Sequence, residues 1–321
     1  MQTTQLKTVE LGATGLEITR IGFGAWAIGG GGWEFGWGAQ EDEQSIEAIQ
    51  RALELGVNWI DTAAAYGFGH SEEVVGRAIK GLDRPPYVFT KASLVPGPGG
   101  RVQHTLKRDS ILREAHDSLM RLGVDAIDLY QIHWPIPDAD IEEGWSAFAE
   151  LKEQGLIRHL GVSNFDVAQL RRIQSIAPVE TLQPQYSLIE RGIEDEILPW
   201  TEHAGTGVIV YSPMGSGLLT GAMTRDRIRS LPDEDWRKHD PRFQDPALAR
   251  HLALVERLRT VAERYETTQG AIAVAWTLRN PAVDGAIVGF RGRGQVDPIL
   301  DAAAIALTDA DAAEIEAGNS E

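Results

Sequence analysis

Residues 58–76 read NWIDTAAAYGFGHSEEVVG, and this stretch sets the pattern for the rest of the chain. Its apolar start, closely followed by turn residues, predicts a short buried strand over 58–61 that ends at Asp61. Small residues and two glycines predict a flexible loop over 63–69. Tyr66 is therefore expected on a loop above the end of a strand.

A helix is expected directly after this loop. Ser71, with two glutamates behind it, predicts the N-cap of a helix over residues 71–80. Taken alone, the whole stretch is better explained by Asp61 as a strand-end cap and Tyr66 as an ordinary half-exposed aromatic. Whether Asp61 and Tyr66 are catalytic residues therefore has to be judged from the rest of the chain.

The alternation of a short apolar strand and a helix occurs eight times. The predicted strands are 21–23, 58–61, 87–91, 126–133, 157–163, 181–186, 207–211 and 286–288. The predicted helices are 43–55, 71–80, 109–122, 141–154, 166–176 and 193–203, with others near 246–265 and 268–279 and after the last strand. Eight such units predict a closed α/β barrel, the (β/α)8 TIM barrel, with extra helices after strands 7 and 8. Residues 6–10 and 16–19 predict an N-terminal β-hairpin that closes one end of it.

Composition limits the classes of function. The 321 residues carry no composition shift that would mark a linker, so 1–321 is predicted to be a single domain. The chain has no cysteine, which excludes thiolate catalysis and cysteine-bound metal sites, and its histidines lack metal-ligand spacing, so no metal is expected. No signal sequence or membrane span is predicted, which indicates a cytoplasmic protein. A net charge of −17 repels polyanions, so neither nucleic acid nor a membrane is expected as a partner. The sequence does not indicate an oligomeric state.

Polar residues stand where the predicted strands end, which is where barrel enzymes place their catalytic groups. Asp61, Lys91 and His133 end three successive strands of the barrel. Singly, Lys91 is more often a solvated strand end and His133 more often a core histidine. Three ionisable groups emerging from apolar runs are nevertheless costly to bury unless they pair with one another.

Asp, Tyr, Lys and His without a metal or a thiol can carry out proton transfer. An ammonium beside the Tyr66 phenol is expected to lower its pKa by about 1–3 units, and Lys91 is placed to supply it. Asp61 would keep Lys91 charged, and neutral His133 would donate a hydrogen bond to a substrate oxygen. Such a set of residues protonates an oxygen on which negative charge develops, as when a hydride attacks a carbonyl carbon.

Motifs along nearly the whole chain resemble the aldo-keto reductase signatures. They are DTA at 61–63 with YG at 66–67, VFTK at 88–91, LYQIHW at 129–134, GVSNF at 161–165, QPQYS at 183–187 and YSPMGSGLLTG at 211–221. WAIGG at 26–30 and HDPRFQ at 239–244 resemble the bacterial general-stress and inositol-locus branch of these NADP-dependent reductases. The resemblance implies a barrel that binds NADP(H) without a Rossmann domain, and a catalytic tetrad of Asp61, Tyr66, Lys91 and His133.

The resemblance also implies a cofactor site. Ser163, Asn164 and Gln183 would hydrogen-bond the nicotinamide carboxamide, Tyr211 would stack on the ring, and Arg291 would be the main cation for the adenosine 2′-phosphate. The other residues assigned to this site are Ala25, Trp26, Asp61, Ser212, Pro213, Met214, Gly215, Ser216, Gly217, Gly289 and Gln295. Glycines in 212–217 would let backbone amides approach the pyrophosphate. Trp26, Trp33 and Trp134 are candidate walls of the substrate mouth.

The chain departs from the family pattern in two places. Ala222 stands where many relatives have a lysine, and Pro298 and Ile299 stand where many have an acid and an amide that hold adenine. The choice between NADP and NAD therefore stays open, and Arg242 and Arg293 are possible substitutes for the missing contacts.

The sequence thus predicts an oxidoreductase that moves hydride between NADPH and an aldehyde or ketone, with Tyr66 as the proton donor. Two alternatives stay open. One is an NADPH-binding redox sensor or regulatory scaffold with negligible turnover, and the other is a metal-dependent barrel hydrolase. The substrate is a small carbonyl or alcohol compound, chosen by loops around 95–105 and 224–243 whose shapes residue types do not predict.

Overall fold

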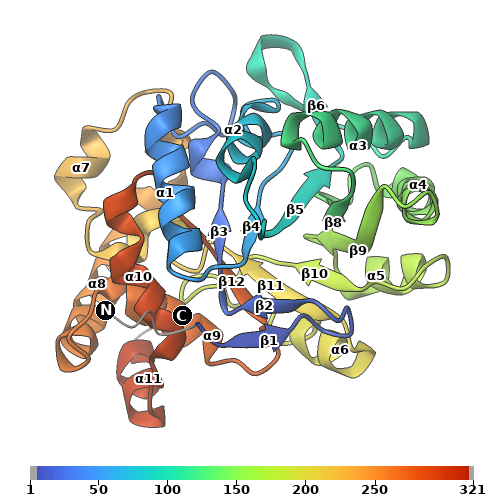
Figure 1. The fold of residues 1–321 in the computed structure, drawn as a ribbon. Coiled ribbons are helices and arrows are strands. Elements are labelled where there is room, and N and C mark those ends of the chain that lie inside the picture. The colour runs from blue at the N-terminus through green and yellow to red at the C-terminus, as the bar shows by residue number, and fades with distance from the viewer. Residues whose placement is uncertain (1–5, 318–321) are drawn as a thin grey trace.

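The computed structural model describes residues 6–317, and eight parallel strands within it close into a barrel (Figure 1). In barrel order the strands are β3 (Ile21–Gly24), β4 (Trp59–Asp61), β5 (Tyr87–Ala92), β8 (Ile127–Ile132), β9 (Ile157–Ser163), β10 (Thr181–Gln183), β11 (Gly207–Tyr211) and β12 (Gly285–Gly289). Since β12 pairs with β3, the sheet has no free edge. The predicted (β/α)8 barrel is confirmed.

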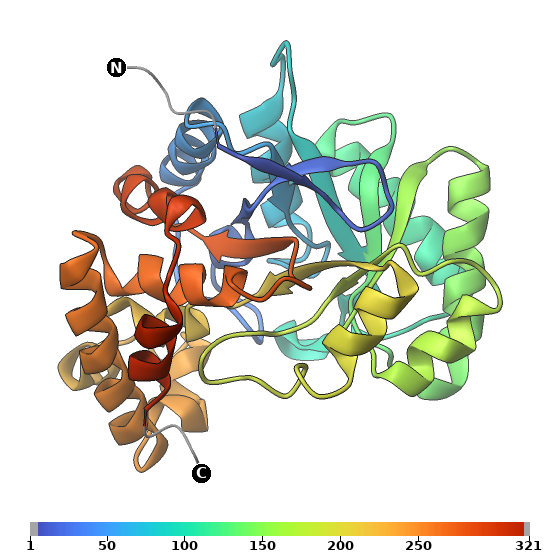
Figure 2. The same ribbon diagram turned by 90° about the horizontal axis from the view of Figure 1, so that it is seen from below.

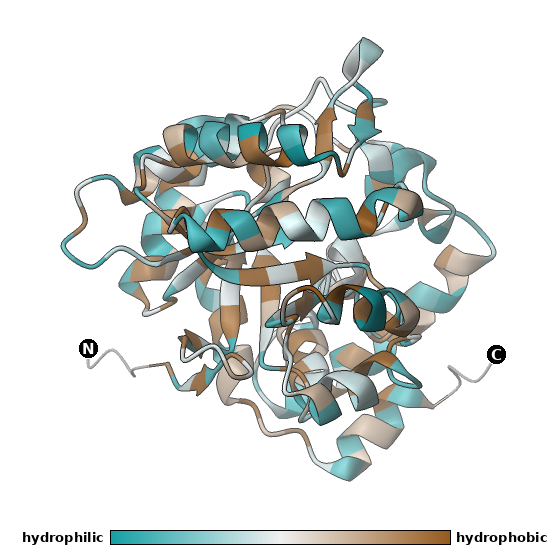
Figure 3. Ribbon diagram, turned by 90° about the vertical axis from the view of Figure 1, so that its right-hand side faces the viewer, coloured by the Kyte–Doolittle hydropathy of each residue, from teal (hydrophilic) through white to brown (hydrophobic). Residues whose placement is uncertain are grey.

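Helices surround the strands. The α-helices are α1 (Asp42–Glu54), α2 (His70–Ile79), α3 (Arg108–Leu122), α4 (Ile141–Glu153), α5 (Val167–Gln174), α6 (Ile197–Ala204), α7 (Arg225–Arg229), α8 (Ala247–Arg264), α9 (Gln269–Leu278), α10 (Asp297–Leu300) and α11 (Asp309–Glu316). The 3₁₀ helices are Trp26–Ile28, Pro98–Gly100, Asp138–Asp140, Gly215–Thr220, Trp236–His239, Pro241–Phe243, Arg293–Gln295 and Asp301–Ala304. The outer helices carry hydrophilic residues interspersed with hydrophobic ones (Figure 3). The extra helices expected after the seventh and eighth strands are α7 to α9 and α10 to α11.

Two hairpins stand outside the barrel. The N-terminal one, β1 (Thr8–Glu10) with β2 (Glu17–Thr19), was predicted and lies across one end of the barrel (Figure 2). The other, β6 (Leu94–Pro96) with β7 (Val102–His104), is formed by the loop around 95–105, whose shape the sequence did not predict. Its two short strands flank the 3₁₀ turn at Pro98–Gly100.

Several predicted boundaries were wrong. Helix α2 begins at His70 and not at Ser71, because Gly69, at φ 102°, takes the N-cap position in the left-handed conformation that glycine adopts without strain. The Ser71 side chain instead lies inside the helix, where it donates to the Ala25 carbonyl at 2.9 Å. The sixth strand stops at Gln183, and α6 begins at Ile197, four residues later than predicted.

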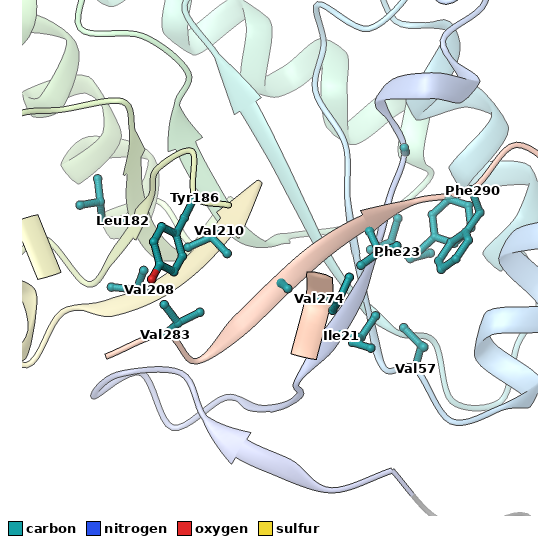
Figure 4. Packing of buried hydrophobic residues seen from close by; sticks show 14 of the residues in the cluster. Ile21, Phe23, Val57, Leu182, Tyr186, Val208, Val210, Val274, Val283 and Phe290 are labelled. Carbon is teal, nitrogen blue, oxygen red and sulfur yellow. The ribbon is translucent and has the colours of Figure 1, made fainter. Parts of the chain in front are cut away.

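The hydrophobic core has two layers. The larger cluster fills the space between the outer faces of the strands and the helices. Figure 4 shows part of it, where Phe23 from β3 meets Phe290 with ring centroids 5.6 Å apart. The smaller cluster fills the barrel interior and consists of Leu11, Leu16, Ile18, Trp59, Phe89, Leu129, Ile209 and Ile287. The N-terminal hairpin contributes the first three of these, so it plugs the end of the barrel opposite the carboxyl ends of the strands.

Trp59 in this inner cluster depends on a glycine in the neighbouring strand. A Cβ atom on Gly22 would lie 2.2 Å from the Trp59 ring, and the indole is fully buried. Well-packed interiors tolerate such overpacking poorly. The Trp59 indole therefore requires a glycine at position 22, and the two residues pack directly against each other in the inner cluster.

We expect Gly22→Ala to lower the free energy of unfolding by about 3 kcal/mol, because neither the strand nor the enclosed indole has room to move. Denaturant unfolding measures the effect. Gly192→Ala is the matched control, since an added Cβ there meets nothing within 4 Å. Equal stability of the two variants would contradict the packing described here.

Candidate active site

The alternation of side chains along the strands builds a polar layer above the apolar plug. Trp59, Phe89 and Leu129 point into the barrel, so the residues two positions further along face inward as well. These are Asp61, Lys91 and Gln131, and Lys91 is directly opposite Gln131 in the pairing of β5 with β8. The carboxyl ends of three neighbouring strands thus bring three polar side chains into one buried layer.

Lys91 has an oxygen partner for each of its three N–H groups. Its Nζ donates to Asp61 Oδ1 at 2.5 Å, to the Thr62 carbonyl at 2.8 Å and to Tyr66 Oη at 3.2 Å. The residue is 1% exposed. The expected contact between the ammonium and the phenol is therefore present, with the carboxylate on the other side.

The second oxygen of Asp61 is also satisfied. Gln183 Nε2 donates to Asp61 Oδ2 at 2.8 Å, and Gln131 Nε2 donates to it at 3.3 Å. The two amides are linked, because Gln183 Nε2 lies 3.0 Å from Gln131 Oε1. Sequence reasoning missed Gln131, although its place two residues before His133 on an alternating strand was the signal. Gln183, predicted at the cofactor, here also orients the carboxylate.

Tyr66 lies in a turn that the barrel holds firmly. Its N–H donates to the Ala63 carbonyl at 3.1 Å, and its carbonyl accepts from the N–H of Ser71, in the first turn of α2, at 3.1 Å. The side chain is 9% exposed and lines the cavity described below. The segment expected to be a flexible loop is a run of hydrogen-bonded turns.

Burial decides the protonation states of these groups. Burial, and then the Asp61 charge, raises the pKa of Tyr66 well above its usual range, whereas the sequence predicted a lowered pKa. That prediction was wrong about the net direction, because it weighed the ammonium and left out desolvation. Burial also lowers the pKa of Lys91, against the opposing charges of Asp61 and Glu72.

Burial also keeps the His133 imidazole neutral. Burial, followed by the Lys91 charge and His104, lowers its pKa well below the usual range. Its ring packs edge-on against Tyr66, with ring centroids 5.7 Å apart, and its backbone N–H donates to the Ala92 carbonyl at 2.9 Å. Within residues 6–317 its Nδ1 has no hydrogen-bond partner. A neutral imidazole beside the phenol can donate a hydrogen bond to an incoming oxygen.

A cavity of about 630 Å³ opens above this layer. Most of the predicted cofactor residues line it, namely Ala25, Trp26, Asp61, Ser163, Asn164, Gln183, Tyr211, Ser212, Pro213, Met214, Ser216, Gly217, Gly289, Arg291 and Gln295. Tyr66, His133, Trp33 and Trp134 line it too. Lys91 lies beneath the lining, and Gly215 faces away, since an added Cβ would lie 2.8 Å from the Ile189 side chain.

Hydrogen bonds connect the residues predicted to hold the nicotinamide. Tyr211 Oη donates to Asn164 Oδ1 at 2.8 Å, and Asn164 Nδ2 donates to the His133 carbonyl and to Ser163 Oγ, both at 3.0 Å. Ser163 Oγ donates in turn to the Gln183 carbonyl at 2.7 Å. Four strand ends are thereby joined in one network beside the tetrad.

Aromatic side chains roof the cavity. Trp26 stacks on Trp236 with ring centroids 5.3 Å apart, and Trp37 meets Trp26 edge-on at 5.2 Å. The backbone N–H of Trp236 also donates to the Gly36 carbonyl at 3.3 Å. The loop after β3 and the insertion before α8 therefore meet over the cavity. Trp37 and Trp236 were not predicted, because their meeting depends on two irregular segments.

Other classes of site were searched for in the described part of the chain. Between residues 6 and 317 no group of histidine, aspartate and glutamate side chains is arranged to hold a metal ion. No helix in this range is long and apolar enough to cross a membrane.

A cavity at the carboxyl ends of barrel strands, with a buried Asp–Lys–Tyr–His set, defines a class of barrel oxidoreductase. A model of the aldo/keto reductase family matches residues 20–319. The chain belongs to this family and is an oxidoreductase that reduces carbonyl compounds, as its motifs predicted.

Individual relatives fit this assignment and the expected bacterial branch. An aldo-keto reductase, YhdN, from Bacillus subtilis (strain 168) is 39% identical over 97% of this chain and 92% of its own. An NADH-specific methylglyoxal reductase from Escherichia coli (strain K12) is 35% identical over 96% of both chains. The solved structure of a glycerol dehydrogenase from Gluconobacter oxydans has a TM-score of 0.87 and is 37% identical, covering 98% of this chain and 95% of that one.

The buried Asp61–Lys91 pair leads to a stability prediction. Asp61→Asn leaves Lys91 in the interior either charged without its counter-ion or forced to lose its proton, so we expect a loss of about 3 kcal/mol in the free energy of unfolding. The double variant Asp61→Asn with Lys91→Met should lose less, because it buries no unpaired charge. Denaturant unfolding of wild type, both single variants and the double variant forms a complete cycle. Additive losses would contradict a coupled pair.

Proposed function

We propose that this protein reduces an aldehyde or ketone to the alcohol with NADP(H), and that Tyr66 delivers the proton to the carbonyl oxygen. The observation that carries the proposal is the placement of Tyr66 Oη, which lines the cavity while accepting a hydrogen bond from the buried Lys91 ammonium. When bound, the dinucleotide supplies the hydride to the carbonyl carbon. The chain's own residues supply the proton and the orientation.

Proton delivery follows from the charges around Tyr66. Burial keeps the phenol protonated across the neutral range, as a proton donor must be. As the proton moves to the substrate oxygen, negative charge grows on Tyr66 Oη, where the Lys91 ammonium already donates. The interaction between Lys91 and Tyr66 is thus stronger in the transition state than before it, which is what lowers a barrier.

His133 orients the carbonyl. Its imidazole is neutral and borders the cavity beside Tyr66, so it donates a hydrogen bond without competing for the transferred proton. Trp26, Trp33 and Trp134 give the cavity an apolar lining beside Tyr66 and His133, which limits the access of water to the reacting atoms.

The cavity fits a dinucleotide. It continues from the tetrad along residues 212–217, which glycines and left-handed residues shape, to Gly289 and Arg291 after the last strand. We assign the nicotinamide end to Ser163, Asn164, Gln183 and Tyr211, and the pyrophosphate to the 212–217 segment. Arg227, Arg237, Arg242 and Arg291 also line the cavity, and such cations are what a phosphorylated ligand of an acidic protein requires.

Tyr66→Phe should reduce kcat for aldehyde reduction by about 10²–10⁴-fold, because the proton donor is lost, with little change in the affinity for NADPH. Aldehyde-dependent loss of NADPH absorbance measures the rate, with a panel of aldehydes, ketones and sugars as substrates. Tyr265→Phe is the control, since that hydroxyl donates to Asp311 outside the cavity. Equal and negligible rates in wild type and Tyr66→Phe would favour an NADPH-binding sensor.

The pH dependence of kcat should be flat near neutrality and fall on the alkaline side. His133 stays neutral because its pKa is well below the ordinary 6.5, so its titration removes no activity above that pH. Lys91 has a pKa below the ordinary 10.5, so its ammonium and the activity are lost before that pH. Rates from pH 6 to pH 10 test this. A loss of activity on acidification centred near pH 6.5 would show that His133 titrates as an exposed imidazole.

A further inference from the structure

Ser93 directly follows β5 and has a backbone conformation that serine rarely adopts. Its φ is 89°, in the left-handed half of the backbone map where residues other than glycine are uncommon. The residue is fully buried. Such a conformation persists only where the surrounding structure enforces it, and it is most frequent near functional sites. The hydrogen bonds of Ser93 to its neighbours therefore have to hold this conformation.

Ser93 connects two walls of the cavity. Its carbonyl accepts from the Thr105 N–H at 3.0 Å, which closes the base of the β6–β7 hairpin. Its Oγ accepts from the backbone N–H of Trp134 at 3.3 Å and donates to the Trp134 carbonyl at 3.4 Å. Trp134 and Leu94, the residue after Ser93, both line the cavity. One buried serine thus sets the positions of both apolar side chains.

The tip of the hairpin is attached separately. Glu34, in the loop after β3, donates its backbone N–H to the Gly100 carbonyl at 2.9 Å, and its Oε2 accepts from the Val102 N–H at 3.1 Å. The hairpin, which projects from the upper edge of the molecule in Figure 1, is therefore held at both ends. Its base at Ser93 is the end next to Leu94, so the base positions the wall of the cavity.

Glu114 on α3 holds Ser93 from outside the barrel. Its Oε2 accepts from the Ser93 N–H at 3.0 Å, and its Oε1 accepts from Ser110 Oγ at 3.1 Å. The residue is 7% exposed. Burial raises the pKa of Glu114 to about 7, against the opposing effects of these two hydrogen bonds and of the Arg113 charge. A buried carboxyl group that the proton transfer does not use therefore supports the conformation of Ser93.

We propose that Glu114 and Ser93 are positioning residues for the carbonyl substrate, which hold Leu94 and Trp134 where they contact an apolar group beside the carbonyl. This inference rests on the proposed function, because it concerns the same cavity. Without the Glu114 acceptor, the Ser93 N–H is buried without a partner, and its strained backbone and both walls shift. Lys91 keeps its own oxygen partners, so the proton donor stays in place.

Steady-state kinetics at saturating NADPH, with benzaldehyde and acetaldehyde as substrates, test the assignment. Glu114→Ala should raise KM for benzaldehyde about 5- to 20-fold, as expected for the loss of one buried hydrogen bond, while kcat changes less than about threefold. KM for acetaldehyde, which has no ring for the walls to contact, should rise less than about threefold. Glu114→Gln should keep the wild-type KM, because its Oε1 can accept from Ser93 while its Nε2 donates to Ser110 Oγ.

Ser93→Gly is the second variant, and it decides the question if Glu114→Ala does not fold. Glycine adopts a φ of 89° without strain and keeps both backbone hydrogen bonds, so only the Oγ contacts to Trp134 are lost. We expect KM for benzaldehyde to rise about 3- to 10-fold in this variant. Asp284→Ala is the matched control, since that carboxylate also accepts from backbone N–H groups, but at the opposite end of the barrel. It should lower stability and leave KM unchanged.

An unchanged KM for benzaldehyde in both Glu114→Ala and Ser93→Gly would overturn the inference. A similar rise for both aldehydes, or an equal rise in Asp284→Ala, would also overturn it, because the effect would then be a general loosening of the fold. So would a loss confined to kcat, since Ser93 would then act on Lys91. Wild-type protein that does not reduce benzaldehyde would contradict the assigned walls, whereas wild-type protein that oxidises NADPH with no carbonyl compound would overturn the proposed function itself.

Discussion

The burial of one positive charge, that of Lys91, is the constraint on which the rest of the site depends. An ammonium with almost no access to water needs an oxygen for every N–H, and the chain provides Asp61, the Thr62 carbonyl and Tyr66 Oη. Asp61 in turn needs donors, which Gln131 and Gln183 supply from two further strands. Satisfying the charge therefore fixes both the path of the chain after β4 and the position of the phenol. The geometry that suits proton transfer is the one that the buried charge requires.

The need of a buried charge for partners applies most strictly near the tetrad and less strictly in the rest of the cavity. Near the tetrad every charge is enclosed and has a partner, so protonation states are set by burial. Elsewhere in the cavity, arginines lie on irregular segments, where Arg237 pairs with Asp235 and Arg242 with Asp240. With an overall charge of −17, the protein attracts an anionic ligand only where such local cations gather.

The sequence predicted most of the barrel and the tetrad, because both follow from short-range patterns. Asp61, Lys91 and His133 each end an apolar run, and strand ends in a barrel converge. Gln131 was missed because its role depends on the interior alternation of β8. Ser71 was wrongly taken as a cap, because the left-handed Gly69 starts α2 one residue earlier. The partners of Arg291, at residues 37 to 40, could not be predicted, since they come from a loop about 250 positions away in the sequence.

The tryptophans over the cavity give the protein a spectroscopic signal of its own. Trp26, Trp37 and Trp236 lie with ring centroids 5.2 to 5.8 Å apart. The first two belong to the loop after β3, and the third belongs to the insertion before α8, which is far away in the sequence. Indoles in such proximity couple their electronic transitions, which adds an exciton contribution to the circular dichroism that separated indoles do not give. The protein thus carries an intrinsic optical probe of whether these two segments are joined over the groove, and no label has to be attached to observe it.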